Sequence, residues 1–248
     1  MHIRLATPRD LHRLAEITVT SLEDDPTFPY MWRYRHEYPE DNFFWWQLQL
    51  TDDLCNKKYT FLVTVTDNDD DFAQDVPTDT IVAWAIWERL GNSAAARARW
   101  ARKNTWHNAF DILVIKATAW SISKRYSRRD ADPARVGAFI EEEARVRATF
   151  FTPDYPEMWY MQLLVTHRDF RRHGAASRLV AWGTTEADSE GIHCGTESSP
   201  MGEPVYKSFG FREIGRMTVQ VEGDQETLDF PVMLRAPRTK AARDEKMS

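Results

Sequence analysis

The segment from Met158 to Glu190 constrains the fold of this chain more than any other. It opens with a run of mostly apolar residues, MWYMQLLVT, which predicts a buried strand over 158–166. A basic turn follows, and a helix with small and apolar residues on one face begins at Gly174. The segment therefore predicts a strand, a basic turn and a helix that begins at a glycine.

The start of this helix has the properties of an anion-binding site. A helix N-terminus leaves backbone N–H groups unpaired and carries the positive end of the helix dipole, and both favour a phosphate. Gly174 lets an oxygen atom approach the backbone closely, and Arg171, Arg172 and His173 add positive charge. The G-x-G-x-x-G and G-K-[ST] patterns of other phosphate-binding loops are absent. An ordinary helix start with surface arginines is the alternative.

The rest of the chain shows a regular order of elements. Strands are predicted at 2–6, 61–66, 80–88, 192–198, 213–221 and 228–234. Helices are predicted at 8–22, 43–50, 97–103, 138–150 and 203–208. The segment 23–42 reads as irregular, 67–79 as an acidic loop inside an antiparallel hairpin, 90–157 as a helical insertion, and 236–248 as a disordered tail.

The composition argues against several classes of protein for this chain. The chain has 248 residues, 32 Lys and Arg against 38 Asp and Glu, and a net charge of −6, which argues against a nucleic-acid binder. No apolar run reaches about eighteen residues and the first residues form no signal peptide, so we expect no membrane contact and a cytoplasmic location. Cys55 and Cys194 are far apart and no paired-histidine spacing occurs, so neither a disulfide framework nor a metal is expected.

Aromatic residues are abundant, with 10 Trp, 13 Phe and 8 Tyr. One aromatic stretch also carries carboxylates and contains Asp25, Phe28, Tyr30 and Trp32. This combination suits a cationic or aromatic amine, which would be held by charge and by cation–π contact. The alternative is that the rings only pack this loop onto the core.

Two short motifs connect these features to a known family. Residues 171–176, RRHGAA, match the pattern [RQ]-x-x-G-x-[GA], and residues 205–211, VYKSFGF, resemble the element L-Y-x-x-x-G-F. Both motifs, their spacing and the order of elements resemble the GNAT superfamily of acetyl-CoA-dependent N-acetyltransferases over 2–235. The long insertion at 90–157 and Ser199, where many members have asparagine, depart from the family pattern and leave the acceptor open.

The resemblance implies a fold and a domain organisation. The fold would be α/β (α+β), with a mixed, mostly antiparallel central sheet whose central strands splay apart and whose faces are covered by helices. A single domain would span 1–235, with the helical insertion 90–157 between its third and fourth strands.

The resemblance also implies a co-substrate and its site. Acetyl-CoA would pair its pantetheine arm with the backbone of Leu164, Val165 and Thr166. Its pyrophosphate would lie on the loop and helix start formed by Arg171, Arg172, His173, Gly174, Ala175, Ala176 and Ser177.

The remaining roles follow the chemistry of direct acetyl transfer. Tyr206 matches the tyrosine that protonates the leaving thiolate, with packing as the alternative role. Glu197 is a candidate general base, and the alternative is that it anchors a neighbouring group of the site. We expect a small-molecule amine as acceptor and no covalent enzyme intermediate. A protein lysine or N-terminal acetyltransferase and a non-catalytic acyl-CoA-binding module are the alternatives, and the oligomeric state stays open.

Overall fold

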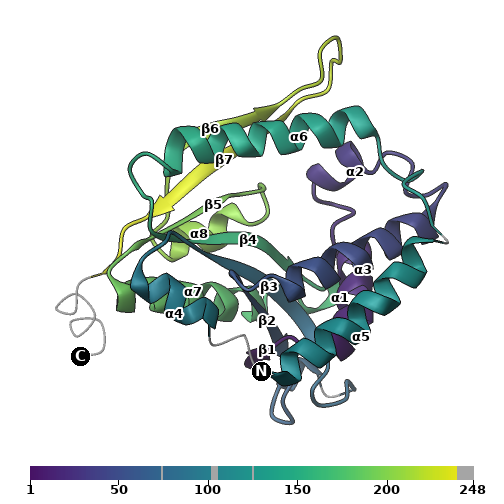
Figure 1. Cartoon of the computed structure of the whole chain (residues 1–248), viewed down its shortest axis with the longest axis horizontal. Helices are drawn as coiled ribbons and strands as arrows, with labels where there is room; N and C mark the ends of the chain where they lie inside the picture. The colour runs from purple at the N-terminus through teal and green to yellow at the C-terminus, as the bar shows by residue number, and fades with distance from the viewer. Residues whose placement is uncertain (74, 102–105, 125, 239–248) are drawn as a thin grey trace.

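In a computed structural model of the chain, a seven-stranded sheet lies at the centre of the molecule (Figure 1). The structure describes residues 1–73, 75–101, 106–124 and 126–238. The strands are β1 His2–Leu5, β2 Tyr59–Val65, β3 Ile81–Leu90, β4 Met158–Thr166, β5 His193–Glu197, β6 Arg212–Val219 and β7 Leu228–Arg235. Their order across the sheet is β1-β2-β3-β4-β5-β7-β6. Among the strands of the described residues, only the β4–β5 pair is parallel, so the predicted mixed, mostly antiparallel sheet is confirmed.

Helices cover both faces of this sheet. The helices are α1 Leu11–Ser21, α2 Thr27–Met31, α3 Pro39–Cys55, α4 Ala94–Ala101, α5 Trp106–Ser123, α6 Pro133–Val146, α7 Ala175–Glu190 and α8 Glu203–Ser208. One hydrophobic cluster joins the sheet to α1, α2, α3 and α6, and a second joins its other face to α7 and α8. Helix α5 runs along α3 (Figure 1).

Strand β3 shows why the central strands are nearly continuous apolar runs. It is covered on both faces, so successive side chains enter opposite clusters. Trp84 lies in the cluster of α1 and α3, whereas Trp87 lies beneath α7 and donates from Nε1 to the carbonyl of Leu179 at 3.1 Å. A Cβ atom at Gly183 would lie 2.0 Å from the Trp87 ring, so this glycine allows α7 to lie close to the sheet.

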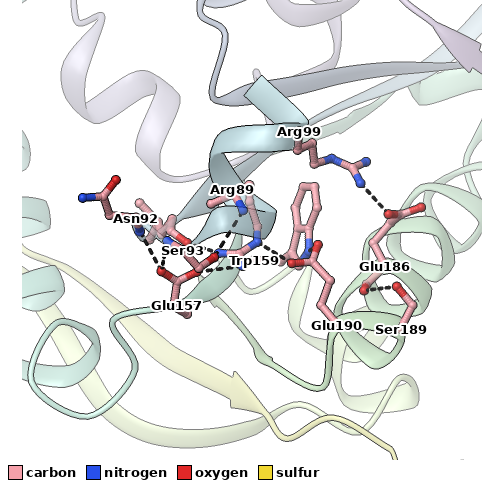
Figure 2. A network of polar contacts seen from close by, with 11 residues as sticks. Arg89, Asn92, Ser93, Arg99, Glu157, Trp159, Glu186, Ser189 and Glu190 are labelled. Carbon is pink, nitrogen blue, oxygen red and sulfur yellow. Dashed lines mark hydrogen bonds and ion pairs between the residues drawn. The ribbon is translucent and has the colours of Figure 1, made fainter. Parts of the chain in front are cut away.

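The base of the insertion is joined to the core by a buried ion network (Figure 2). Arg89, at the end of β3, is 2% exposed and makes ion pairs of 2.8 Å with Glu157 and Glu190. Glu157 also accepts from the amides of Asn92 and Ser93. Buried charges of this kind persist only when they are paired. The network therefore holds both ends of the insertion against the end of α7.

Some predicted boundaries are wrong. The segment 23–42 is not irregular throughout, because it contains α2 and the start of α3. The carboxylate of Asp25 accepts from the amide of Thr27 at 3.0 Å just before α2, a local turn interaction that apolar periodicity does not reveal.

The insertion is helical, as predicted, but α5 was not expected. Its apolar residues do not gather on one side of the helix, so the sequence shows no amphipathic period.

Nothing in the described part of the chain combines the length and apolarity that a membrane-crossing helix needs. Most of the predicted disordered tail, 239–248, lies outside the described residues.

Candidate functional site

The two central strands separate within the sheet. Strand β4 is parallel to β5 only where Met158–Tyr160 lie opposite His193–Gly195. The β3–β4 register is shifted at Gln162, which interrupts the regular pairing of β4. In the described structure the later part of β4 is thus paired with β3 only. The predicted pantetheine edge, Leu164 to Thr166, lies in this part.

The predicted phosphate loop lies directly after β4. Arg172 and Gly174 adopt left-handed backbone conformations, with φ of 69° and 83°, and α7 begins at Ala175. Successive amides in such a turn at a helix start form a concave anion site. The structure therefore brings the residues from Arg171 to Ser177 together at the open end of β4.

The side chains of this loop contact neighbouring connections. The guanidinium of Arg171 pairs with the carboxylate of Asp24, with one contact of 3.0 Å, and also donates to the carbonyl of Ser21. This pairing lowers the pKa of Asp24. The His173 ring stacks on Phe72 at a centroid distance of 4.2 Å. Through Arg171 the loop is joined to the α1–α2 connection, and through His173 to the β2–β3 connection. No local pattern in the sequence predicts these contacts.

The two predicted catalytic residues lie close to the point where the strands separate. Glu197 ends β5, and its Oε2 accepts a hydrogen bond from the hydroxyl of Tyr160 on β4. Its Oε1 is buried and has no hydrogen-bond partner in the described part of the chain. Burial is the main cause that raises the pKa of Glu197 to about 8, and the charge of Glu143 raises it further while Arg147 lowers it.

Tyr206 lies on α8 and is 4% exposed. Burial raises the pKa of its hydroxyl far above the ordinary range, a hydrogen bond with Thr196 opposes this, and the charges of Glu197 and Asp25 add to it. The phenol therefore stays protonated at neutral pH and is able to donate a proton. The hydrogen bond with Thr196, the neighbour of Glu197 on β5, places Tyr206 next to the predicted base.

The predicted acceptor residues occupy the core side of this region. Phe28, Tyr30 and Trp32 are between 1% and 4% exposed and belong to the cluster under α1–α3. Trp32 lies 4.9 Å from Phe28 and 5.1 Å from Trp46, measured between ring centroids. The rings pack the segment onto the core, and contact with an acceptor stays a prediction for them. The hydroxyl of Tyr30 and the indole N–H of Trp32 are buried without a partner among the described residues.

The aromatic surplus is not gathered on the acceptor side alone. Trp87 and Trp159 are fully buried in the other cluster, beneath α7. Strands β3 and β4 are covered on both faces, so their large rings are divided between the two clusters.

Cys194 is buried, and burial raises the pKa of its thiol to about 12, so it is not a reactive nucleophile. His193 lies beside Tyr155, with ring centroids 4.5 Å apart. Within the described ranges the structure groups no three His, Cys, Asp or Glu side chains as a metal site.

Comparisons with known proteins agree with this geometry. The model of the family "Acetyltransferase (GNAT) domain" matches residues 141–223, from α6 to β6. This range contains the separating strands, the loop, Glu197 and Tyr206. A curated protein of the fungus Stachybotrys chartarum, named acetyltransferase, is 26% identical over 224 residues, which cover 90% of this chain and 86% of the relative.

Solved structures show the same fold. A Corynebacterium glutamicum structure, described as histone acetyltransferase HPA2 and related acetyltransferase, has a TM-score of 0.56 at 16% identity and covers 96% of each chain. Another, described only as an acetyltransferase, has a TM-score of 0.51 at 14% identity, with coverage of 96% of this chain and 100% of its own.

Proposed function

Because this chain belongs to the GNAT superfamily and is an acyltransferase, we propose that it transfers an acetyl group from acetyl-CoA to the amine of a small molecule. One observation carries the proposal. A protonated tyrosine, Tyr206, and an unpaired carboxylate oxygen, Glu197 Oε1, lie in one region where the central strands separate.

The residues present fit acetyl-CoA as the co-substrate. The edge of β4 from Leu164 to Thr166 would pair with the pantetheine arm, as an added strand pairs with a sheet edge. The amides from Arg172 to Ser177 would hold the pyrophosphate at the start of α7. The left-handed turn supports this assignment, because it aims several N–H groups at one point.

The chemistry is a direct transfer. The amine nitrogen attacks the thioester carbonyl, and the carbon–sulfur bond then breaks. Tyr206 gives its proton to the leaving thiolate, and Glu197 takes the proton that the amine loses. A carboxyl with a pKa of about 8 is a suitable base, because its conjugate acid titrates near the working pH.

A small acceptor is favoured by the way the acceptor side is closed. Arg135 of α6 is 4% exposed, makes ion pairs with Asp224 and Glu226 of the β6–β7 connection, and lies 4.6 Å from the centre of the Tyr30 ring. These contacts join the insertion, the hairpin and the α2 segment. A protein acceptor needs an open groove at this place.

The test is acetyl transfer by the purified full chain. Acetyl-CoA is supplied with a panel of small amines and with peptides that offer a lysine or a free N-terminus, and both thiol release and product mass are measured. Tyr206→Phe should lower kcat by about 10²- to 10⁴-fold and leave the affinity for coenzyme A unchanged. Tyr34→Phe, at a residue that is 39% exposed, is the matched control.

Three results would contradict the proposal in different ways. Acetylation of the peptides alone would replace the small acceptor by a protein. Binding of coenzyme A without any transfer would favour a binding module. Equal rates for wild type and Tyr206→Phe would remove the tyrosine from the reaction.

A further inference from the structure

The two oxygens of Glu197 have different surroundings. Oε2 accepts from the hydroxyl of Tyr160, a residue of β4 that is 1% exposed. Oε1 is buried and lacks a hydrogen-bond partner among the residues the structure describes. A buried polar atom without a partner costs free energy unless a ligand satisfies it.

The insertion reaches this carboxylate through Tyr160. The guanidinium of Arg147 lies 4.1 Å from the centre of the Tyr160 ring, a cation–π distance. Arg147 begins the π-helical turn Arg147–Phe151 that follows α6. Such turns are rare and occur frequently at functional sites.

Residues of three different elements bind the guanidinium of Arg147. It donates to Glu88 of β3 at 3.1 Å, to Glu143 of α6 at 3.1 Å and to Gln162 of β4 at 2.9 Å. Gln162 is the residue at the β3–β4 register shift. The irregular residue of β4 and the irregular turn after α6 thus meet at one guanidinium.

We propose that Tyr160 and Arg147 are positioning residues for Glu197, so that the insertion contributes directly to the reacting carboxylate. Tyr160 binds one oxygen and leaves the other for the acceptor amine, and Arg147 fixes the ring of Tyr160 from above. The part of Glu197 in turnover rests on the proposed function, whereas its positioning by these two residues does not.

The groups around Glu197 predict the direction in which each of them shifts its pKa. Tyr160 on β4 donates to the carboxylate and Arg147 is cationic, so both favour its ionised form. Glu143 on α6 is anionic and disfavours that form. Tyr206 on α8 interacts with Glu197 electrostatically, and Glu88 of β3 accepts a hydrogen bond from Arg147.

The experiment measures the titration of Glu197 directly. Glutamate labelled with ¹³C at its side-chain carboxyl is incorporated into the full chain, and Glu197→Gln identifies the signal. The wild-type signal should titrate near pH 8. Arg147→Met should move the midpoint upward by about 1 to 3 pH units, Tyr160→Phe should also move it upward, and Glu143→Gln should move it downward.

Activity provides the second readout. If acetyl transfer is observed, the acidic limb of kcat/KM against pH should shift in the same three directions. A role limited to packing would lower rates without opposite shifts of the midpoint. Failure of acetyl transfer would contradict the proposed function and leave the carboxyl titration valid as a test.

The inference is overturned if the three variants titrate as the wild type does, or if Tyr160→Phe and Glu143→Gln shift the midpoint in the same direction. Tyr160→Phe and Glu143→Gln each alter a single polar group. Their titrations therefore test the positioning of Glu197 even if Arg147→Met does not fold. Near-ultraviolet circular dichroism establishes which variants are folded.

Discussion

At the scale of single residues, burial determines which acidic groups are protonated. Asp53, in the last turn of α3, is 9% exposed and has Gln49 as its hydrogen-bond donor at 3.1 Å. Burial is the main cause that raises its pKa to about 7, and the charge of Asp52 adds to the shift. The folded protein therefore binds a proton at Asp53 that the unfolded chain releases near its ordinary pKa.

This difference predicts a pH-dependent stability. The contribution of Asp53 is fully present below the unfolded pKa of 3.8 and is lost as pH rises toward about 7. Asp53→Asn keeps the acceptor for Gln49 and cannot ionise. It should raise the free energy of unfolding at pH 8 by ~1 to 4 kcal/mol relative to the wild type, and by much less at pH 4.

Urea unfolding at both pH values measures this effect. The matched control is Asp52→Asn, which changes an exposed carboxylate on the same turn. The prediction fails if Asp53→Asn is no more stabilising at pH 8 than at pH 4, or if Asp52→Asn produces the same gain.

At the scale of elements, the two ends of α7 provide a matched pair of glycines. Gly174 precedes the helix with φ of 83°, and Gly191 follows it with φ of 69°. An alanine in a left-handed conformation costs about 1 to 2 kcal/mol, so Gly174→Ala and Gly191→Ala should lower Tm similarly. Only Gly174→Ala should also weaken coenzyme A binding, because only this end presents free N–H groups.

Isothermal calorimetry with coenzyme A separates the two variants. Equal affinity in both would show that the start of α7 does not hold the pyrophosphate. An equal loss in both would show that the effect is one of general destabilisation.

The packing of α7 on β3 gives a second prediction at this scale. A methyl group at Gly183 would lie 2.0 Å from Trp87, so Gly183→Ala must displace a buried ring or the helix. Overpacking of this kind costs typically about 1 to 3 kcal/mol. Gly137→Ala, in α6, meets nothing within 4 Å and should instead stabilise by about 0.4 to 1 kcal/mol. Urea unfolding should give opposite signs, and two equal effects would contradict the packing argument.

At the scale of the whole molecule, the ion network of Figure 2 joins three segments far apart in the sequence. Arg89 pairs with Glu157, which is 68 positions later, and with Glu190, 101 positions later. Trp159 donates from Nε1 to Glu190 at 3.0 Å. Burial disfavours the charge of Glu157, but hydrogen bonds from Ser93, Asn92 and Arg89 prevail and lower its pKa to about 2.

Arg89→Met should therefore destabilise the protein strongly. Removing one partner of a fully buried ion pair costs about 3 to 5 kcal/mol. Glu157 and Glu190 are 29% and 20% exposed, so water partly compensates them and the loss should lie below that range. Arg145→Met breaks an exposed pair with Glu142 and should cost less than about 1 kcal/mol. Denaturant unfolding of both variants tests this, and similar losses would show that the network is not a main support of the insertion.

Local patterns predicted much of this fold and part of the site. The run of nine residues before the basic turn predicted β4, and the glycine after that turn predicted the start of α7. Both depend on interactions between near neighbours along the chain, so the sequence alone determined them. Tyr206 was predicted from its place within the motif of residues 205–211, and Glu197 from its place at the end of a predicted strand. Their roles in the reaction stay predictions.

Only the tertiary structure decided how distant side chains meet. The pairing of Arg171 with Asp24 joins residues 147 positions apart, and Tyr160 and Glu197 come together across the only parallel strand pair of the described sheet. Arg147 reaches Tyr160 because a π-helical turn and a register shift in β4 bring it there. Such contacts depend on strand order, register and helix packing, which no local period encodes. The sequence by itself determined the strands, α7 and the loop before it, and the packing decided the surroundings of the carboxylate.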